Sequence, residues 1–162
     1  ALGHDRKIVR AMPNTPSLVN AGMTSVTPNA LVTSEDVADV LNIFRCFGEA
    51  EVIAEPMIHP VVGVSGSAPA YVFMFIEAMA DAAVLGGMPR AQAYKFAAQA
   101  VMGSAKMVLE TGKHPGELKD MVCSPGGTTI EAVRVLEDRG FRSAVIEAME
   151  KCMEKSEKLS KS

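Results

Sequence analysis

Residues 71–85 read YVFMFIEAMADAAVL, and this stretch decides the fold. Its only charges, Glu77 and Asp81, lie one helical turn apart, and the remaining circumference is apolar. A helix that is apolar nearly all round has to be buried nearly all round. The roughly one hundred helical residues of this chain cannot easily enclose it, since small domains bury a limited fraction of their surface. Two covers are open: a second copy of the chain, which we favour, or a compact helical bundle with this helix at its centre.

The next predicted helix, at 89–111, also favours a second copy as the cover. Its centre, AYKFAAQAVMGSAKMVL, is rich in Ala and Gly and permits close approach of another helix. Large homo-oligomer interfaces resemble a protein core divided between two chains. We therefore expect at least a homodimer, and the sequence leaves open a larger oligomer built from dimers.

The character of the chain changes at Glu55, with strands before it and helices after it. The strands are predicted at 7–12, 23–27 and 51–54. Thr33 or Ser34 caps a helix between the last two strands, and Gly48 ends it. Proline starts and glycine stops then mark the later helices, which are predicted at 69–85, 89–111, 115–122, 128–139 and 141–162. The fold class is therefore mainly α, with a short α/β part at 1–54 and an all-helical part at 55–162.

The composition excludes several classes of partner. The net charge is −3, Trp is absent and aromatic residues make up 5% of the chain, so there is no basic footprint for nucleic acid. The longest apolar run, 61–76, is interrupted by Gly, Ser and Pro and stopped by Glu77, which predicts no membrane span. The opening, ALGHDRKIVR, lacks the apolar segment of a signal peptide. We expect no nucleic acid and no membrane among the partners.

The metal-binding residue types are scattered along the chain. His59 and His114 each precede a proline, where they shape turns. The cysteines contain no C-x-x-C pair and are far apart, at Cys46, Cys123 and Cys152. This pattern predicts a reduced, cytoplasmic protein without a metal site.

The stretch SPGGTT, residues 124–129, has two interpretations. In the first, Pro125 and Gly126 make a turn with a positive φ at the glycine, and Thr128 caps the following helix. Glu131, three residues after Thr128, would complete a capping box. The spacing alone favours this capped turn.

In the second interpretation the same helix start binds an anion, because its first N–H groups are unpaired and carry partial positive charge. Gly126 and Gly127 let the anion approach the backbone, and Ser124 adds a hydroxyl donor. No Lys or Arg lies within the motif, so a single carboxylate fits better than a triphosphate. Thr129 then presents its hydroxyl beside the bound anion.

A second glycine-containing stretch, GVSGSAPAY at 63–71, has the composition of a phosphate loop. It lacks the lysine of a P-loop, and it does not match G-x-G-x-x-G, whose third glycine would fall at Ala68. We interpret it as a bend that leads the backbone into the long helix.

The stretch HPGELKDMVCSPGGTTIEAVRVLE, at 114–137, closely resembles the signature of pyrroline-5-carboxylate reductases. Further stretches are similar to segments of the same family in the same order: IVRAMPNTP at 8–16, VSGSAPAYVF at 64–73 and GFRSAVIEAM at 140–149. The resemblance covers essentially the whole chain. It implies that 1–54 is the last part of a Rossmann domain and that 55–162 is a helical dimerisation and substrate-binding domain.

The resemblance also implies that the cofactor is bound mainly by a segment that this sequence lacks. Family members begin with the glycine-rich loop that binds NADPH or NADH, and no such loop is present here. We therefore expect this chain to be the C-terminal portion of a longer enzyme and to hold the cofactor poorly by itself. The choice between NADPH and NADH is made at the ribose site, in the absent part.

The implied reaction is hydride transfer from NAD(P)H to the C=N carbon of 1-pyrroline-5-carboxylate, which gives proline in the last step of proline biosynthesis. The resemblance makes Thr129 the donor to the ring nitrogen and places Glu55 near the substrate. It assigns the substrate carboxylate to Ser124, Gly126, Gly127 and Thr128. It places Met12, Pro13 and Asn14 beside the nicotinamide. The active site is expected at the dimer interface.

Two alternatives belong to other classes. The chain could be the helical half of another Rossmann-linked dehydrogenase that acts on hydroxy acids. Such enzymes use a lysine, and the central candidates here, Lys106 and Lys119, lie outside the glycine motif. The chain could also be a non-catalytic helical assembly module.

Overall fold

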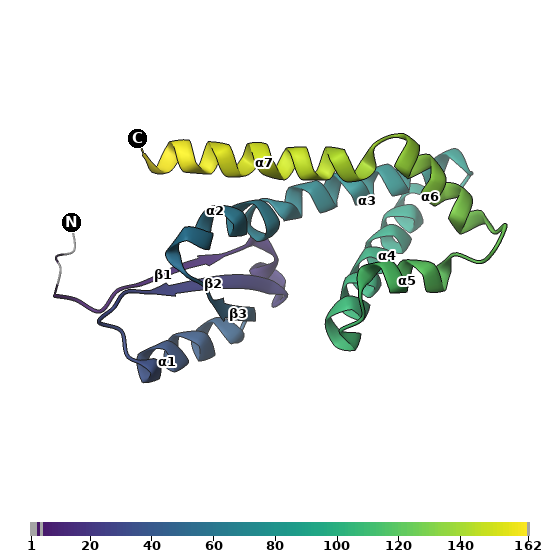
Figure 1. Ribbon diagram of the computed structural model, residues 1–162. Coiled ribbons are helices and arrows are strands. Elements are labelled where there is room, and N and C mark those ends of the chain that lie inside the picture. The colour runs from purple at the N-terminus through teal and green to yellow at the C-terminus, as the bar shows by residue number, and fades with distance from the viewer. Residues whose placement is uncertain (1–2, 4, 162) are drawn as a thin grey trace. The chain divides into compact units, whose positions relative to one another are not determined.

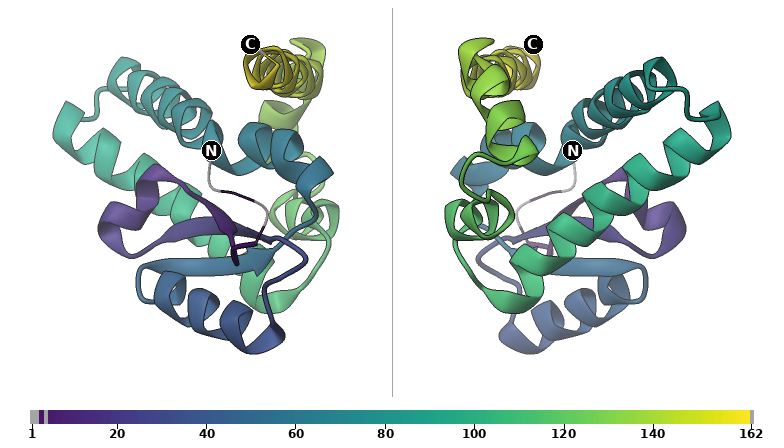
Figure 2. Two further views of the ribbon diagram at one scale, coloured as in Figure 1. Left: turned by 90° about the vertical axis from the view of Figure 1, so that its left-hand side faces the viewer. Right: turned by 90° about the vertical axis from the view of Figure 1, so that its right-hand side faces the viewer.

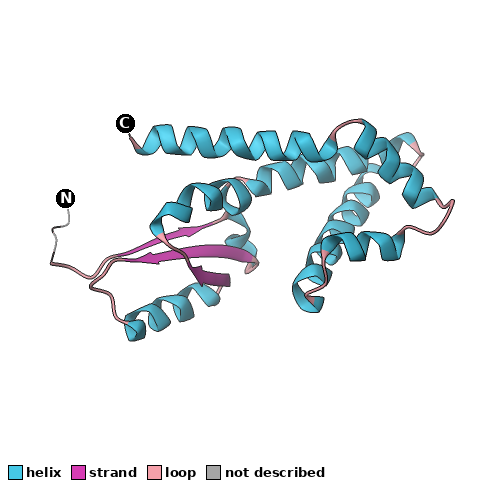
Figure 3. Ribbon diagram, viewed as in Figure 1, coloured by secondary structure: helices cyan, strands magenta, loops and turns pink. Residues whose placement is uncertain are grey.

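The computed structural model describes Gly3 and residues 5–161 and divides into two compact units. Unit 1 comprises Ala1–Tyr71 together with Ala148–Ser162, and unit 2 comprises Val72–Glu147. Strands occur in unit 1, whereas the described elements of unit 2 are helices (Figure 3). The mainly α fold class is confirmed.

Unit 1 is built on a three-stranded sheet with the order β1-β2-β3. β1 (Val9–Pro13) runs antiparallel to β2 (Gly22–Pro28), and β2 runs parallel to β3 (Gly48–Val52). A 3-10 turn, η1 (Thr15–Val19), joins the first two strands. Among the described residues β1 is an edge strand, where a proline at the strand end, Pro13, is tolerated.

The parallel pair requires a crossover, which α1 (Ser34–Arg45) supplies. Thr33 caps this helix as predicted: its Oγ1 accepts from the Asp36 N–H at 3.2 Å, and the Thr33 N–H donates to the Asp36 carboxylate at 2.8 Å. α1 lies on one side of the sheet and α2 (Ile58–Val61) on the other (Figures 1 and 2). The middle strand is consequently buried from Thr24 to Thr27, and Val26 is 0% exposed.

The predicted position of the third strand, 51–54, is wrong. Gly48, interpreted as the end of a helix, is the first residue of the strand and pairs with Gly22. Its φ is 151°, and a Cβ there would lie 2.1 Å from the Gly22 carbonyl oxygen. This approach of two backbones requires glycine, and it joins residues too far apart in sequence for a local pattern to reveal.

The segment after the sheet is continuously helical. It begins with η2 (Glu55–Met57), α2 and the π turn η3 (Val62–Gly66) and continues as α3 (Ala68–Leu85). By length and composition alone Glu55–Leu85 could cross a membrane, because an 18-residue window within it has a mean hydropathy of 1.5. The expectation that Gly, Ser and Pro interrupt this apolar run is therefore wrong, because the π turn contains the glycines and Pro69 lies in the first turn of α3.

The remaining helices follow the predicted proline and glycine boundaries. They are α4 (Arg90–Thr111), α5 (Pro115–Val122), α6 (Thr128–Asp138) and α7 (Phe141–Ser160). Gly112 and Gly140, after α4 and α6, have φ values of 63° and 69°. His114 begins α5 by accepting the Gly116 N–H on Nδ1 at 3.0 Å, which confirms its role in a turn.

Unit 2 has a small interior of its own. The buried residues of α3 and α4 are alanines: Ala80, Ala93 and Ala97. Large apolar side chains of α3 remain open, with Phe73 60% and Met74 69% exposed. Within the described residues this helix is therefore not the centre of a compact bundle, and its large apolar side chains lack a cover. Of the two α3 charges, Asp81 pairs with Arg90.

Candidate active site

The first part of the candidate site is the turn from Ser124 to Gly127, which leads into α6. The Gly127 N–H donates to the Ser124 carbonyl oxygen at 3.0 Å. Pro125 occupies the second position and Gly126, with a φ of 68°, the third. These are the features of a type II turn, so the predicted positive φ at Gly126 is confirmed.

Gly127 lies directly against Ser124. A Cβ on Gly127 would be 2.3 Å from the Ser124 Oγ and 3.1 Å from its carbonyl oxygen. With the Ser124 hydroxyl in this position there is no room for a side chain on Gly127, and a larger residue would displace that hydroxyl from the helix start.

The interpretation of Thr128 as the N-cap in a capping box is wrong. Gly127, with a φ of −80° and a ψ of 173°, is the N-cap, and α6 begins at Thr128 without a side-chain cap bond. Glu131 instead accepts from Arg134 at 2.7 Å, and this hydrogen bond lowers the pKa of Glu131. Thr128 is already helical, so its hydroxyl cannot cap the N–H groups that follow it.

The start of α6 thus leaves backbone N–H groups available to a ligand. The N–H groups of Thr128, Thr129 and Ile130 precede the first possible i−4 partner, and no side chain of the described residues caps them. They carry the positive end of the helix dipole. Thr129 is half-buried, whereas Ser124 and Thr128 are exposed. The geometry can bind one carboxylate and present the Thr129 side chain next to it.

A separate group of predicted site residues lies at the end of β1 in unit 1. Met12 and Pro13 are the last residues of the strand, and Pro13 is exposed. The Asn14 Oδ1 accepts the Met23 N–H at 2.9 Å, and its Nδ2 donates to the Ser65 carbonyl oxygen at 3.2 Å. The amide of Asn14 is therefore engaged at both ends within the protein.

Glu55 lies in the same unit, at the start of η2. Its Oε1 accepts from Arg10 Nη1 at 2.9 Å, and both side chains are more than half exposed. No local sequence pattern indicates this ion pair, because its partners are 45 residues apart. Met12, Pro13, Asn14 and Glu55 thus belong to unit 1, whereas Ser124, Gly126, Gly127, Thr128 and Thr129 belong to unit 2.

The fit for a dinucleotide cofactor is partial. Pro13 is exposed and Met12 half-buried, so the ring of Pro13 is open to a ligand. A loop that binds the phosphates of the cofactor is not indicated by this sequence, because it lacks the motif G-x-G-x-x-G. The glycines at 63 and 66 lie in a π turn closed by a 2.8 Å bond from Ser67 N to the Val62 carbonyl oxygen. They therefore do not form a phosphate loop.

The lysines proposed for a different dehydrogenase are both paired. Lys119 Nζ lies 2.6 Å from Asp120 and Lys106 Nζ lies 3.4 Å from Glu110. The hydrogen bond with Asp120 raises the pKa of Lys119, so this amine stays charged and is a poor base. Neither lysine has the environment that a proton-accepting residue requires.

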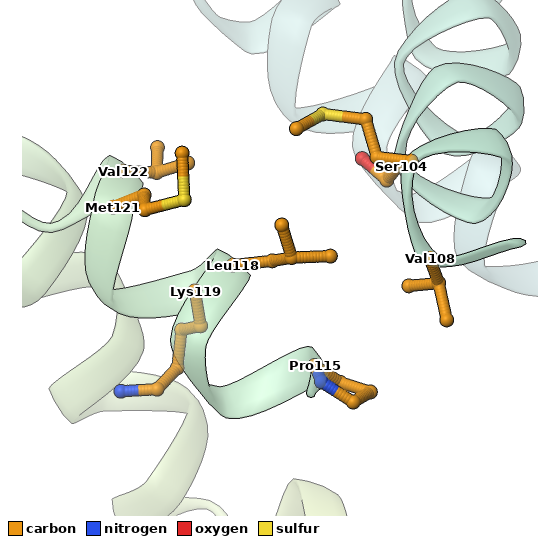
Figure 4. A pocket seen from close by; sticks show the side chains of 8 residues that line it. Ser104, Val108, Pro115, Leu118, Lys119, Met121 and Val122 are labelled. Atoms are coloured by element: carbon orange, nitrogen blue, oxygen red, sulfur yellow. The ribbon is translucent and has the colours of Figure 1, made fainter. Parts of the chain in front are cut away.

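A separate cavity of about 400 Å³ lies between α4 and α5 in unit 2 (Figure 4). Its lining is mainly apolar, and the amine of Lys119 points away from Leu118 and Val108 (Figure 4). It offers a substrate no convergent polar groups. The cavity therefore belongs to the exposed apolar surface of unit 2.

Comparisons with known proteins agree on one family. Residues 55–159 match the family model for pyrroline-5-carboxylate reductase dimerisation. A pyrroline-5-carboxylate reductase of Escherichia coli (strain K12) is 93% identical over all of this chain, and one of Arabidopsis thaliana is 45% identical over 99% of it. The chain spans 60% and 58% of the lengths of these relatives.

Solved structures show the same likeness. A pyrroline-5-carboxylate reductase from Coxiella burnetii superposes with a TM-score of 0.93 at 38% identity, over 98% of this chain and 59% of that one. A Plasmodium falciparum pyrroline carboxylate reductase with NADP bound gives 0.88 at 37% identity, over 96% and 62% of the two chains. These matches remove the alternative of a different dehydrogenase family. The chain belongs to the pyrroline-5-carboxylate reductase family.

Proposed function

We propose that this chain supplies the substrate site and the dimer interface of an enzyme that reduces 1-pyrroline-5-carboxylate to L-proline with NADPH or NADH. This is the last step of proline biosynthesis, which we place in the cytoplasm. The observation that carries the proposal is the uncapped start of α6 behind the turn at 124–127. The division into a Rossmann part at 1–54 and a helical part at 55–162 belongs to the same proposal, and it is supported by the family match that begins at residue 55.

The substrate carboxylate binds at the start of α6. It accepts hydrogen bonds from the free N–H groups of Thr128 and Thr129, and the hydroxyl of Ser124 donates to it from the side. Gly126 allows the turn, and Gly127 keeps the approach open. A single charge suffices for this site, because no Lys or Arg in the motif calls for a polyanion.

Thr129 acts on the ring nitrogen of the substrate. When bound, NAD(P)H supplies the hydride that adds to the C=N carbon, and the nitrogen carries a proton in the product. The pKa of a threonine hydroxyl is too high for an ordinary acid, so Thr129 serves as an orienting donor, and the proton comes ultimately from water. Holding the imine carbon toward the nicotinamide is a large part of the barrier reduction.

Met12, Pro13 and Asn14 lie beside the nicotinamide, and Glu55, fixed by Arg10, lies near the substrate. The choice between NADPH and NADH depends on contacts with the ribose of the cofactor, and this chain lacks the sequence motif that makes those contacts. The NADP named for the Plasmodium falciparum structure favours NADPH. A second copy of the chain covers the apolar surface of unit 2, and two chains contribute to each active site.

The test uses a fused reductase, in which the part of the Escherichia coli relative that this chain does not match precedes Ala1. We expect the fused protein to oxidise NADPH with 1-pyrroline-5-carboxylate, followed by nicotinamide absorbance, whereas the 162-residue chain alone shows no turnover. Robust turnover by the chain alone would mean that other residues hold the cofactor.

The residue assignment is tested in the same fused protein. Thr129→Ala should lower kcat by about 10–1,000-fold and change KM less, because a preorganised donor acts mainly in the transition state. Thr128→Ala is the matched control, which keeps the backbone N–H groups and should retain most of kcat. If Thr129→Ala were kinetically silent, the motif would be only a turn at a helix start.

A further inference from the structure

The π turn η3 is the part of the molecule that the sequence interpretation treated only as a bend. Its i→i+5 bond, from Ser67 N to the Val62 carbonyl oxygen, changes the normal helical bonding pattern in this segment. π turns occur often at functional sites. Here the Ser65 carbonyl oxygen accepts from Asn14 Nδ2 at 3.2 Å, and the Ser65 Oγ lies 3.4 Å from the same nitrogen.

The π turn is itself fixed to α7 within unit 1. A Cβ on Gly63 would lie 3.2 Å from Met153 Cγ, so the two helices approach closely there. Cys152 Sγ donates to Ser67 Oγ at 3.2 Å. In α2, the helix that precedes the π turn, His59 Nδ1 lies 2.9 Å from Ser156 Oγ of α7. Residues 59–67 therefore form a supported frame rather than a free loop.

Asn14 connects this frame to the sheet. Its Oδ1 accepts the Met23 N–H at the start of β2, while its Nδ2 reaches Ser65. Met12 lies near the same turn, since a Cβ added to Gly66 would be 3.9 Å from Met12 Cε. The segment Met12–Asn14 is thus clamped between β2 and the π turn.

We infer that Asn14 is a positioning residue for hydride transfer, which acts by holding Met12 and Pro13 against the π turn rather than by binding the cofactor with its own amide. The inference rests on the proposed function, because that function places this segment beside the nicotinamide. Each end of the Asn14 amide already has a partner within the protein, so the clamp gives a reason for an asparagine here without a bond to the cofactor. A displacement of the nicotinamide support by about 1 Å can cost about 100-fold in rate.

The test is Asn14→Asp in the fused reductase. The carboxylate keeps an acceptor for the Met23 N–H but loses the donor to Ser65 and faces its carbonyl oxygen. We expect kcat to fall about 10–100-fold with a small change in KM, and the primary isotope effect with 4-deuterated NADPH to rise as hydride transfer becomes limiting. Asn20→Asp repeats the chemical change at an exposed residue of the same segment and should leave both quantities unchanged.

Amide hydrogen exchange provides a readout without turnover. Asn14→Asp should accelerate exchange of the Ser67 N–H in the π turn and leave the Met23 N–H protected, whereas Asn14→Ala should expose both. If the wild-type fused protein is active and the Asn14→Asp variant keeps the same kcat and isotope effect, the positioning role of Asn14 is overturned, but the proposed function is not. An inactive wild-type fused protein would overturn the proposed function and, with it, the role of Asn14 in hydride transfer. Unchanged exchange at Ser67 would overturn the clamp itself.

Discussion

The two units differ in what they bury. In unit 1, β2 is enclosed by its own chain, with Thr24 1% and Val26 0% exposed, and Ala50 of β3 is 2% exposed. In unit 2 the buried residues of α3 and α4 are alanines, while large side chains stay open, with Leu85 91% and Phe96 65% exposed. The chain covers the middle strand of unit 1, although Leu18 and Val19 of that unit stay 86% and 74% exposed, whereas the long helices of unit 2 bury only alanines.

This difference separates two ways of stabilising a fold. Burial of apolar surface is worth about 25 cal/mol per Å², and unit 2 gains little of it within one chain. The match to a dimerisation family model supports the proposal that a second copy buries the remaining surface. Unit 1 should therefore respond to changes in its own packing, and unit 2 to changes in association.

The largest expected effect follows from charging the open face of α3. Phe73→Glu should dissociate the assembly, because an unpaired charge buried in an interface costs several kcal/mol and about 1.4 kcal/mol is tenfold in affinity. We expect association at least about 100-fold weaker, measured by sedimentation at micromolar concentration. Ile43→Glu on α1 is the matched control, since Ile43 is 62% and Phe73 60% exposed. A well-folded monomeric wild type would contradict the comparison.

The converse change affects unit 1. Gly48→Ala places a Cβ 2.1 Å from the Gly22 carbonyl oxygen at a φ of 151°. We expect a loss of about 3 kcal/mol or more from the free energy of unfolding of the sheet, measured by chemical denaturation. Gly66→Ala is the control, because its Cβ would meet nothing closer than 3.9 Å. If Gly48→Ala weakened self-association but left the free energy of unfolding of the sheet unchanged, the comparison of the two units would be contradicted.

The contrast between units also shows what sequence could predict. Proline and glycine mark the helix boundaries at Pro69, Pro89 and Gly112, and the helices were confirmed there, because these signals act within one turn. The third strand was misplaced because Gly48 meets Gly22, a contact that no local pattern encodes. The open face of α3 could be predicted only as needing a cover, since nothing in one chain's sequence shows which molecule supplies it.

The candidate site divides in the same way. The turn at Pro125 and Gly126 could be predicted because its residues specify their own backbone angles. The spacing of Thr128 and Glu131 could not show that Gly127 is the extended residue, so the cap was misplaced by one position. The bond of Asn14 to Ser65 spans 51 residues and had no sequence signal.

The helix starts of the two units offer a smaller and sharper test. Thr33→Ala removes a capping box and should lower the free energy of unfolding of unit 1 by about 1 kcal/mol. Thr128→Ala removes no cap bond, so its cost should be within about 0.5 kcal/mol. Thermal or chemical unfolding of both variants measures the difference. Equal losses would show that Thr128 caps α6 after all, and the open anion site would be in doubt.

The smallest effect concerns pH and the cap of α1. The hydrogen bond from Lys7, whose Nζ lies 2.5 Å from the Asp36 carboxylate, and those from Thr33 lower the pKa of Asp36 from 3.8 to about 2. A carboxyl group with a lowered pKa in the folded state stabilises that state above its unfolded pKa, and this contribution is lost as the pH falls toward the folded value.

Unit 1 should therefore lose stability between about pH 4 and about pH 2 through Asp36, and Asp36→Asn should remove this part of the pH dependence. Denaturation midpoints of both proteins, measured from about pH 6 to about pH 2, should converge as the pH falls. High salt should reduce the difference at neutral pH, because the Lys7 side chain is 55% exposed and the pair is screened. A difference that stays constant across the range would mean that Asp36 stabilises α1 only by its shape, without its charge.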